Sequence, residues 1–206
     1  MRKVTEKLTD LLDTEYRWPR KGDRLLRDSE DWDRGVDFAR DEISRHVHIW
    51  SGYMNAGALL IKACQDDDQH ERYSLIYPIL FNYRHALELA MKWIIARYGH
   101  YSSVKIGNIQ HHNLWQLWKV CRKIIGSDDN GDNEAVSAVE QVIKDFHDLD
   151  KQAFAFRYSR DKNGALIALP ERMIDLENIR DVMEAVDNFF TGADGQLDAY
   201  AGAADW

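Results

Sequence analysis

The stretch from Tyr73 to Tyr98 (YSLIYPILFNYRHALELAMKWIIARY) is the feature that most constrains this chain. Its large apolar residues recur at the three- and four-residue spacing of an α-helix. Arg84, Glu88 and Lys92 follow one another at steps of four, so they share one side of that helix. The pattern predicts a long helix that packs against other helices and carries one polar stripe.

Composition supports a helical protein. The 206 residues are enough for one core, or for a main domain with an N-terminal extension. With only three prolines and twelve glycines, the chain has few residues that form turns or break helices, which favours helices over a strand-rich sandwich. The net charge of −8 means that the surface as a whole does not attract nucleic acid, so contact with RNA or DNA would need a local basic patch.

The sequence also sets expectations about location and redox state. The start, MRKVTEKLTDLL, lacks the apolar run of a secretion signal, and nowhere do enough apolar residues follow one another to form a membrane-spanning helix. We therefore expect a cytoplasmic protein without a membrane partner. Cys64 and Cys121 lie far apart in helix-like segments, so buried free thiols are expected.

Three segments are expected along the chain. Residues 1–33 combine a short amphipathic helix with a charged linker, and residues 34–191 carry the helical patterns of the main domain. Residues 192–206 are rich in Gly, Ala and Asp, which predicts a flexible C-terminal tail.

Within the main domain the patterns predict an antiparallel helical bundle with one small β insertion. Asn163-Gly164, flanked by alternating and apolar residues between 154 and 169, predicts a β-hairpin before the last helix. Asp175 is expected to cap that helix. The expected helices span approximately residues 34–66, 69–98, 113–125, 136–151 and 175–190.

Three short motifs resemble those of the HEPN domain, an all-helical module of prokaryotic toxins, defence proteins and nucleotide-linked regulators. Arg84–Lys92 (RHALELAMK) is similar to the family's E-L-x-x-K helix. His112–Leu117 is similar to its H-D-L-x-x-L helix start, and Phe156–Tyr158 to its R-Y-P element before the final helix. The resemblance covers about Tyr73–Phe190 and implies an all-α, HEPN-like antiparallel helical bundle.

Many catalytic members of that family are metal-independent RNases with an R-x(4-6)-H motif, in which Arg steadies the phosphate and His moves a proton. The matching pair here is Arg40 and His46. Such a spacing arises by chance about twice in a chain with eight histidines. A solvated, salt-bridged helix face is the structural alternative for this pair.

The second candidate site lies on the resembling helices. Arg84, Glu88 and Lys92 are explained either as an intrahelical ion-pair ladder or as one side of a binding groove. In the groove interpretation, Arg84 and His85 are catalytic candidates among aromatic residues, suited to a phosphate or nucleotide. The side chains expected to bind ligand are Glu88, Lys92, His112, Arg157 and Tyr158.

No spacing of His or Cys indicates a metal site, and no glycine-rich phosphate loop or nucleotide-cofactor fingerprint occurs, so no cofactor is expected. Seven Trp, nine Tyr and seven Phe favour a homodimer. The sequence thus predicts a HEPN-like module of a prokaryotic defence, toxin-antitoxin or stress system that binds a nucleotide or a partner protein such as an antitoxin. The alternative is a metal-independent HEPN ribonuclease that acts on RNA.

Overall fold

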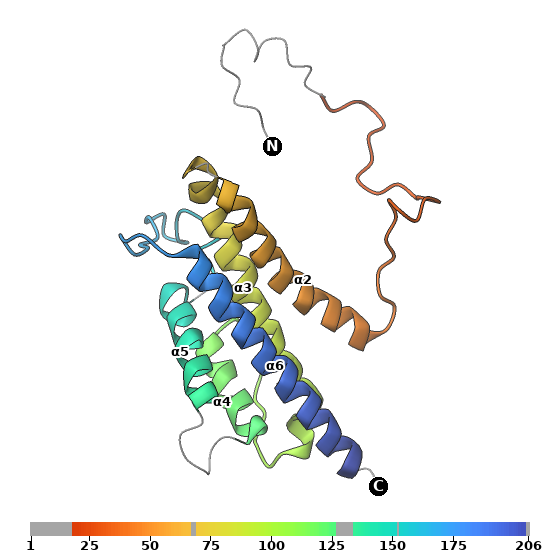
Figure 1. Ribbon diagram of the computed structural model, residues 1–206, viewed down its shortest axis with the longest axis vertical. Helices are drawn as coiled ribbons and strands as arrows, with labels where there is room; N and C mark the ends of the chain where they lie inside the picture. Colours follow the sequence, from red (N-terminus) through yellow and green to blue (C-terminus); the bar gives the residue numbers. More distant parts are fainter. Residues whose placement is uncertain (1–17, 67–68, 127–133, 152, 205–206) are drawn as a thin grey trace. The chain divides into compact units, whose positions relative to one another are not determined.

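The computed structural model describes residues 18–66, 69–126, 134–151 and 153–204. The chain divides into two units, residues 1–38 and 39–206. The described residues contain five α-helices, two 3-10 turns and no strand, which confirms the all-α prediction. All five helices belong to the second unit, where they form a bundle (Figure 1).

The bundle begins with α2 (Glu42–Ala63), later than the residue 34 expected from the sequence. The Asp41 carboxylate accepts a hydrogen bond from the Ser44 backbone N–H at 2.7 Å and so caps the helix. Residues 34–41 are not helical, because a turn closes at Gly35, whose N–H donates to the Asp31 carbonyl at 2.8 Å. The second unit starts at Ala39, and its first helix follows at Glu42.

The long helix α3 (Gln69–Tyr98) follows the 3-10 turn η1 (Cys64–Asp66) and packs along α2, as the sequence predicts. It runs through Pro78 without a break. The two helices approach closely at Gly57, where an added Cβ would lie 2.7 Å from the Tyr83 ring. Gly57 is therefore required by packing, since any side chain would collide with an aromatic ring.

Two shorter helices follow α3 and complete this part of the bundle. A 3-10 turn, η2 (Gly99–Tyr101), ends α3, and α4 (Leu114–Ile125) then packs on it. Asn113 caps α4 through the Gln116 N–H at 2.9 Å, and Gly126 closes it in the left-handed conformation at φ 81°. The next helix, α5 (Glu134–Leu149), packs on α4 through a stripe of apolar residues.

The expected β-hairpin is reduced to a turn closed by a single antiparallel bridge between Arg160 and Leu166. Gly164 occupies the left-handed region at φ 82°, as an Asn-Gly turn requires. The Asp161 carboxylate organises the loop by accepting from the N–H groups of Asn163 and Ala165 at 2.8 and 2.9 Å. No strand forms on either side within the described residues.

The last helix, α6 (Leu176–Ala204), begins where Asp175 accepts from the Glu177 N–H at 3.0 Å. It continues well beyond residue 191, so the prediction of a flexible tail over 192–206 is wrong for its described part, residues 192–204. The physical reason is a stripe at steps of four, in which Ala193 is buried and Leu197 and Ala201 pack against the core. Trp93 also donates to Asp194 at 2.7 Å.

The core of the bundle surrounds α3, whose apolar residues are among the least exposed in the chain. Two of its polar residues, Arg84 and Glu88, are equally inaccessible at 2% each. Charged side chains are almost never fully buried unless they are paired. Their partners, rather than the apolar core, define the first candidate site. The largest fully buried side chains in the described residues include Trp118, Phe190, Ile61, Ile79, Leu87 and Met91.

Candidate functional site

The site is built around the buried guanidinium of Arg84. Its Nη1 lies 3.3 Å from Oε2 of Glu88, one helical turn further along α3. Its Nε lies 3.4 Å from a carboxylate oxygen of Asp150, just after α5, and its Nη2 donates to the His112 carbonyl at 2.8 Å, just before α4. One side chain therefore joins three helices through charge-assisted hydrogen bonds.

Glu88 completes this network toward the surface. Its Oε1 accepts from Lys92 Nζ and from His112 Nδ1, both at 2.8 Å. Burial raises the pKa of Glu88, but the hydrogen bonds from Lys92 and His112 outweigh it and leave the pKa below its ordinary value. Because the carboxylate is ionised, His112 donates through Nδ1. The His112 side chain is 59% exposed, so the network ends at solvent.

Asp150, which the sequence analysis did not single out, anchors the segment after α5. Its Oδ1 accepts from the N–H groups of Phe154 and Ala155 at 2.8 and 3.2 Å. The intervening Ala153 has φ 62°, in the left-handed region that a non-glycine residue rarely adopts. The carboxylate therefore fixes a strained turn and, at the same time, pairs with Arg84.

His85 lies close to the charges of the ion network, but its ring contacts are with aromatic side chains. Its ring stacks on Phe81 at a centroid distance of 5.7 Å and meets the Tyr53 ring edge-on at 4.6 Å. Burial lowers the pKa of His85, and the neighbouring Lys92 and Arg84 lower it further against the opposing effect of Glu88. The imidazole is thus neutral at pH 7 and can accept a proton.

Arg157 lies on the same side of the bundle. Its Nε and Nη2 both donate to the Ala153 carbonyl, at 2.9 and 2.5 Å. Its guanidinium carbon lies 5.9 Å from the centre of the Phe81 ring, 5.6 Å from Phe154 and 5.4 Å from Tyr158. Among the described residues, no group accepts a hydrogen bond from its Nη1.

These side chains form one surface, which we call the aromatic-arginine patch and define as Phe81, His85, Phe154, Arg157 and Tyr158. Phe81 joins its two halves, since it stacks on His85 and lies under Arg157. Phe154 and Tyr158 are 42% and 55% exposed, so the patch is open to solvent. A fixed cation among accessible rings can hold a phosphate and stack a planar group beside it.

The Arg40 and His46 pair is arranged differently. Arg40 is exposed and precedes α2, whereas His46 lies within it. His46 Nε2 is 3.2 Å from the Leu89 carbonyl, and the ring stacks on Trp93 at 4.7 Å. Burial lowers its pKa. A ring nitrogen already engaged by the backbone is poorly placed to exchange a proton with a ligand. The pair is not a solvated, salt-bridged helix face either, because Arg40 precedes the helix and His46 is half-buried against Trp93.

Comparison with protein-family models, curated proteins and solved structures finds no match to this chain. The site is therefore characterised by its own geometry. In the part of the chain that the structure describes, no group of three or more His, Cys, Asp or Glu side chains gathers as a metal site. No helix in those ranges is long and apolar enough to cross a membrane.

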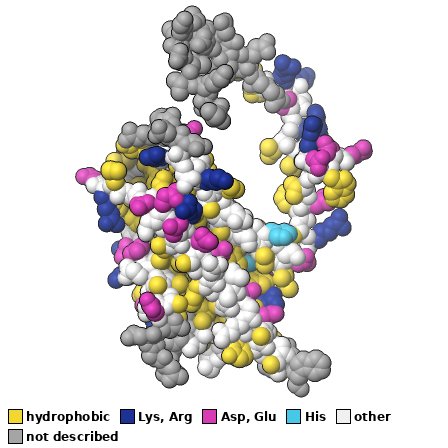
Figure 2. Space-filling view, viewed as in Figure 1, with side chains coloured by type: hydrophobic (Ala, Val, Ile, Leu, Met, Phe, Trp, Pro, Cys, Tyr) yellow, Lys and Arg dark blue, Asp and Glu magenta, His cyan; other side chains and the backbone are white. Residues whose placement is uncertain are grey.

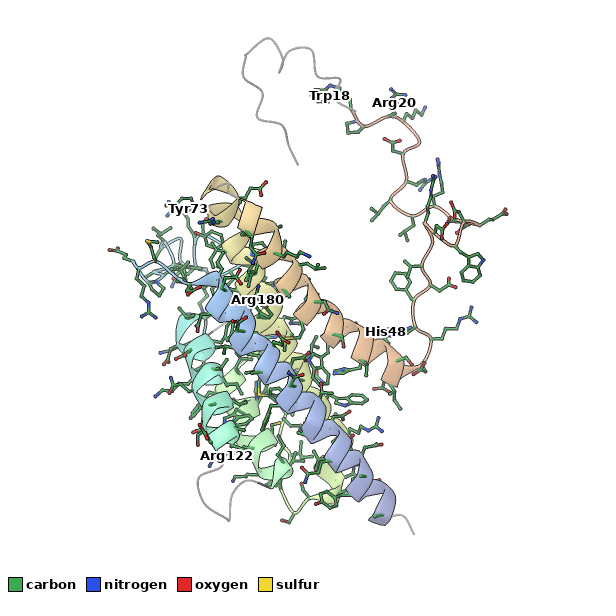
Figure 3. All side chains as sticks on the ribbon, viewed as in Figure 1. Trp18, Arg20, His48, Tyr73, Arg122 and Arg180 are labelled. Carbon is green, nitrogen blue, oxygen red and sulfur yellow. The ribbon has the colours of Figure 1, made fainter. Side chains whose placement is uncertain are left out.

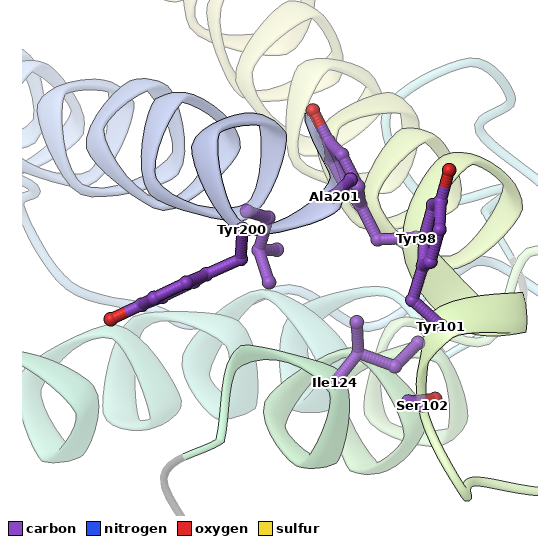
Figure 4. Close-up of a pocket in the computed structure, with 7 residues that line it drawn as sticks. Tyr98, Tyr101, Ser102, Ile124, Tyr200 and Ala201 are labelled. Carbon is purple, nitrogen blue, oxygen red and sulfur yellow. The ribbon is translucent and has the colours of Figure 1, made fainter. Parts of the chain in front are cut away.

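A separate cavity of about 290 Å³ opens at the far end of α3, between that helix, α4 and α6 (Figure 4). Tyr98, Tyr101 and Tyr200 line it together with aliphatic side chains, and none of its lining residues is charged. The Tyr98 hydroxyl donates to the Asp194 carboxylate at 2.7 Å. The cavity is at the lower limit of ligand pockets, and its lining shares no residue with the aromatic-arginine patch.

The structure thus brings together most of the side chains predicted for the site, but in two roles. Arg84, Glu88, Lys92 and His112 form a network that joins helices, with Arg84 and Glu88 inaccessible. His85, Arg157 and Tyr158 face the accessible patch. The sequence analysis placed Arg84 and His85 among aromatic residues but missed the contributions of Asp150, Tyr53 and Phe154, because the contacts that give these three a role join distant segments.

Proposed function

We propose that this protein is a HEPN-like helical module that binds a nucleotide or a short stretch of RNA at the aromatic-arginine patch. Its place in a prokaryotic defence, toxin-antitoxin or stress system is proposed on the three motifs that resemble the HEPN domain. Binding without catalysis is preferred because Arg84, the motif-like cation nearest His85 in sequence, is committed to two buried carboxylates. It has no route to a bound phosphate.

The observation that supports ligand binding is the position of Arg157. Two of its guanidinium nitrogens are held by the Ala153 carbonyl, so the side chain is ordered before any ligand arrives. The remaining Nη1 is available as a charged donor, and three aromatic rings surround the guanidinium. Pre-ordered donors bind anions well because little side-chain entropy is lost on binding. The rings suit stacking of a base.

The test is a titration of the full-length protein with AMP, ATP and a short oligoadenylate RNA, followed by calorimetry. Arg157→Ala should weaken binding by about 10- to 100-fold, as expected for a lost hydrogen bond to a charged group. Arg172→Ala is the matched control, since Arg172 is an exposed arginine in the segment before α6. Its removal changes the net charge equally and should leave affinity unchanged.

Two results would reject the proposal: no binding of any of the three ligands by the parent protein, or equal affinity of the parent and Arg157→Ala. Separate titrations with inorganic phosphate and with adenosine measure the two contributions to affinity: phosphate reports on the guanidinium, and adenosine reports on the aromatic rings. Phe81→Leu should reduce the adenosine contribution more than the phosphate contribution, because it removes the ring shared by His85 and Arg157.

A second candidate function, metal-independent RNA cleavage, is favoured by one observation. The neutral imidazole of His85 and the guanidinium of Arg157 both contact the ring of Phe81. RNA cleavage needs a proton acceptor beside a cation. Mixed RNA incubated without divalent metal separates the two functions. If the parent cleaves, His85→Ala should remove the activity while His46→Ala retains it; if the parent binds RNA and leaves it intact, the binding function stands alone.

A further inference from the structure

Residues 18–38, which we call the arm, leave large apolar side chains in solvent. Leu25, Val36 and Trp32 are 98%, 92% and 91% exposed, and in Figure 2 hydrophobic side chains alternate with charged ones along this segment. Figure 3 shows Trp18 and Arg20 on its ribbon, with side chains extending from the backbone. So dense an apolar series in a short exposed segment marks an interaction site. The complete set is Trp18, Leu25, Leu26, Trp32, Val36 and Phe38.

The arm is ordered locally by two turns. In the first, the Asp23 N–H donates to the Arg20 carbonyl at 3.0 Å, and the Arg20 N–H donates to the Asp23 carboxylate at 2.9 Å. In the second, the N–H groups of Arg34 and Gly35 donate to the Asp31 carbonyl at 3.1 and 2.8 Å. Neither helix nor strand forms between residues 18 and 38, so the backbone in the middle of the arm is open to another chain.

The charges of the arm are arranged with opposite signs about its middle. Basic residues dominate residues 20–27 and acidic residues dominate residues 28–37. If two arms are aligned antiparallel with Arg27 of one opposite Glu30 of the other, Arg24 comes opposite Asp33. The same register places several further complementary pairs. These are Arg20 with Asp37, Asp23 with Arg34, Leu25 with Trp32, Pro19 with Phe38 and Gly22 with Gly35.

We propose that the arm is a dimerisation element that pairs antiparallel with the arm of a second copy of this chain. A two-fold interface must be self-complementary, because the same patch meets itself in reverse order. The arm meets this requirement with four opposite-charge pairs, each made twice, and no like-charge pair in the stated register. Two positions do not match: Lys21 faces Val36 and Leu26 faces Asp31.

The apolar area is sufficient for such a dimer. Trp18, Trp32 and Phe38 are each at least 77% exposed. A buried aromatic side chain covers about 150–250 Å², so the three from each of two arms would bury roughly 900–1,500 Å². A specific interface needs about 1,000 Å² or more. An arm folded back on itself could bury far less, since each ring would have only half of these partners.

The test reverses the charges of the arm in two variants. An acidic-arm variant carries Arg20→Glu, Arg24→Glu and Arg27→Glu, and a basic-arm variant carries Glu30→Lys, Asp33→Lys and Asp37→Lys. Neither set touches the side chains that close the two turns. In each variant three of the four pairs become like-charged and only Asp23 with Arg34 stays opposite, so the dissociation constant of the homodimer should rise about 100-fold or more. Mixing the two variants restores every opposite pair.

Sedimentation velocity on full-length chains should therefore give twice the 24.0-kDa chain mass for the parent, the single-chain mass for each variant, and twice that mass again for the mixture. A parent that sediments at the single-chain mass overturns the proposal, and so do variants that remain dimeric. A mixture that stays monomeric also overturns it, because it shows that the arm pairs only within its own chain. Circular dichroism of each variant confirms that the bundle is folded.

Discussion

Arg84→Met is the substitution that should most disturb this fold. The methionine roughly conserves volume, so the change mainly removes the charge and the donors. It leaves the carboxylates of Glu88 and Asp150 at 2% and 5% exposure, with Asp150 losing its only ion pair among the described residues. Removing one partner of a buried pair costs about 3–5 kcal/mol, because the remaining charge is uncompensated.

The contacts of Glu88 and His112 refine this estimate of the loss in stability. Glu88 keeps Lys92 and His112 as partners, which limits the cost on its side. The carbonyl of His112 loses the 2.8 Å donor, which adds about 1 kcal/mol. We therefore expect a loss of about 4 kcal/mol in the free energy of unfolding. For a chain of this size that corresponds to a fall of roughly 8–16 °C in melting temperature.

Urea denaturation at pH 7 measures the loss, with Arg97→Ala as the control. Arg97 also forms an ion pair, with Asp198, but both side chains are accessible, so its removal should cost about 1 kcal/mol. Adding Asp150→Asn to Arg84→Met should recover about 1–2 kcal/mol, because the amide oxygen can still accept from Phe154 while the unpaired charge disappears.

The pH dependence gives a second measure. The uncompensated carboxylates can take up protons in the variant, so its deficit should shrink as the pH falls from 7 to 5. A deficit of about 1 kcal/mol or less for Arg84→Met, equal to that of Arg97→Ala, would refute the reasoning. It would mean that the buried network contributes no more than a surface ion pair.

Two further predictions concern helix packing and histidine titration. Gly57→Ala should destabilise the bundle by about 1–3 kcal/mol, because its Cβ would collide with the Tyr83 ring. Gly52→Ala is the control and should be neutral or stabilising, because Gly52 has open space around it. Equal melting temperatures of the two variants would contradict this prediction. Burial lowers the pKa of His46 and of His85 below 6.5, so the stability they contribute is present above pH 6.5 and lost as the pH falls through their folded values. His46→Gln should flatten the fall in unfolding free energy between pH 7 and 5, and an unchanged slope would count against it.

The all-α class and one helix cap were determined by the sequence alone. Asp175 was correctly expected to cap the last helix, because a side-chain cap depends on residues only two or three positions away. A helix start was expected at Asn113, which caps α4. The polar stripe of Arg84, Glu88 and Lys92 was also visible, since the helical period fixes which residues share a face.

Only the tertiary structure decided what that stripe does. The period places Arg84 beside Glu88, but the partners that bury it, Asp150 and the His112 carbonyl, come from other helices and are set by how α3, α4 and α5 pack. The same holds for Phe81, whose ring lies under Arg157 from a distant segment. Composition suggested a flexible tail after residue 191, yet residues 192–204 are helical, because a stripe of small and apolar residues finds the core beside it. Local patterns determine which helices can form, whereas long-range packing decides where they end and which charges they bury.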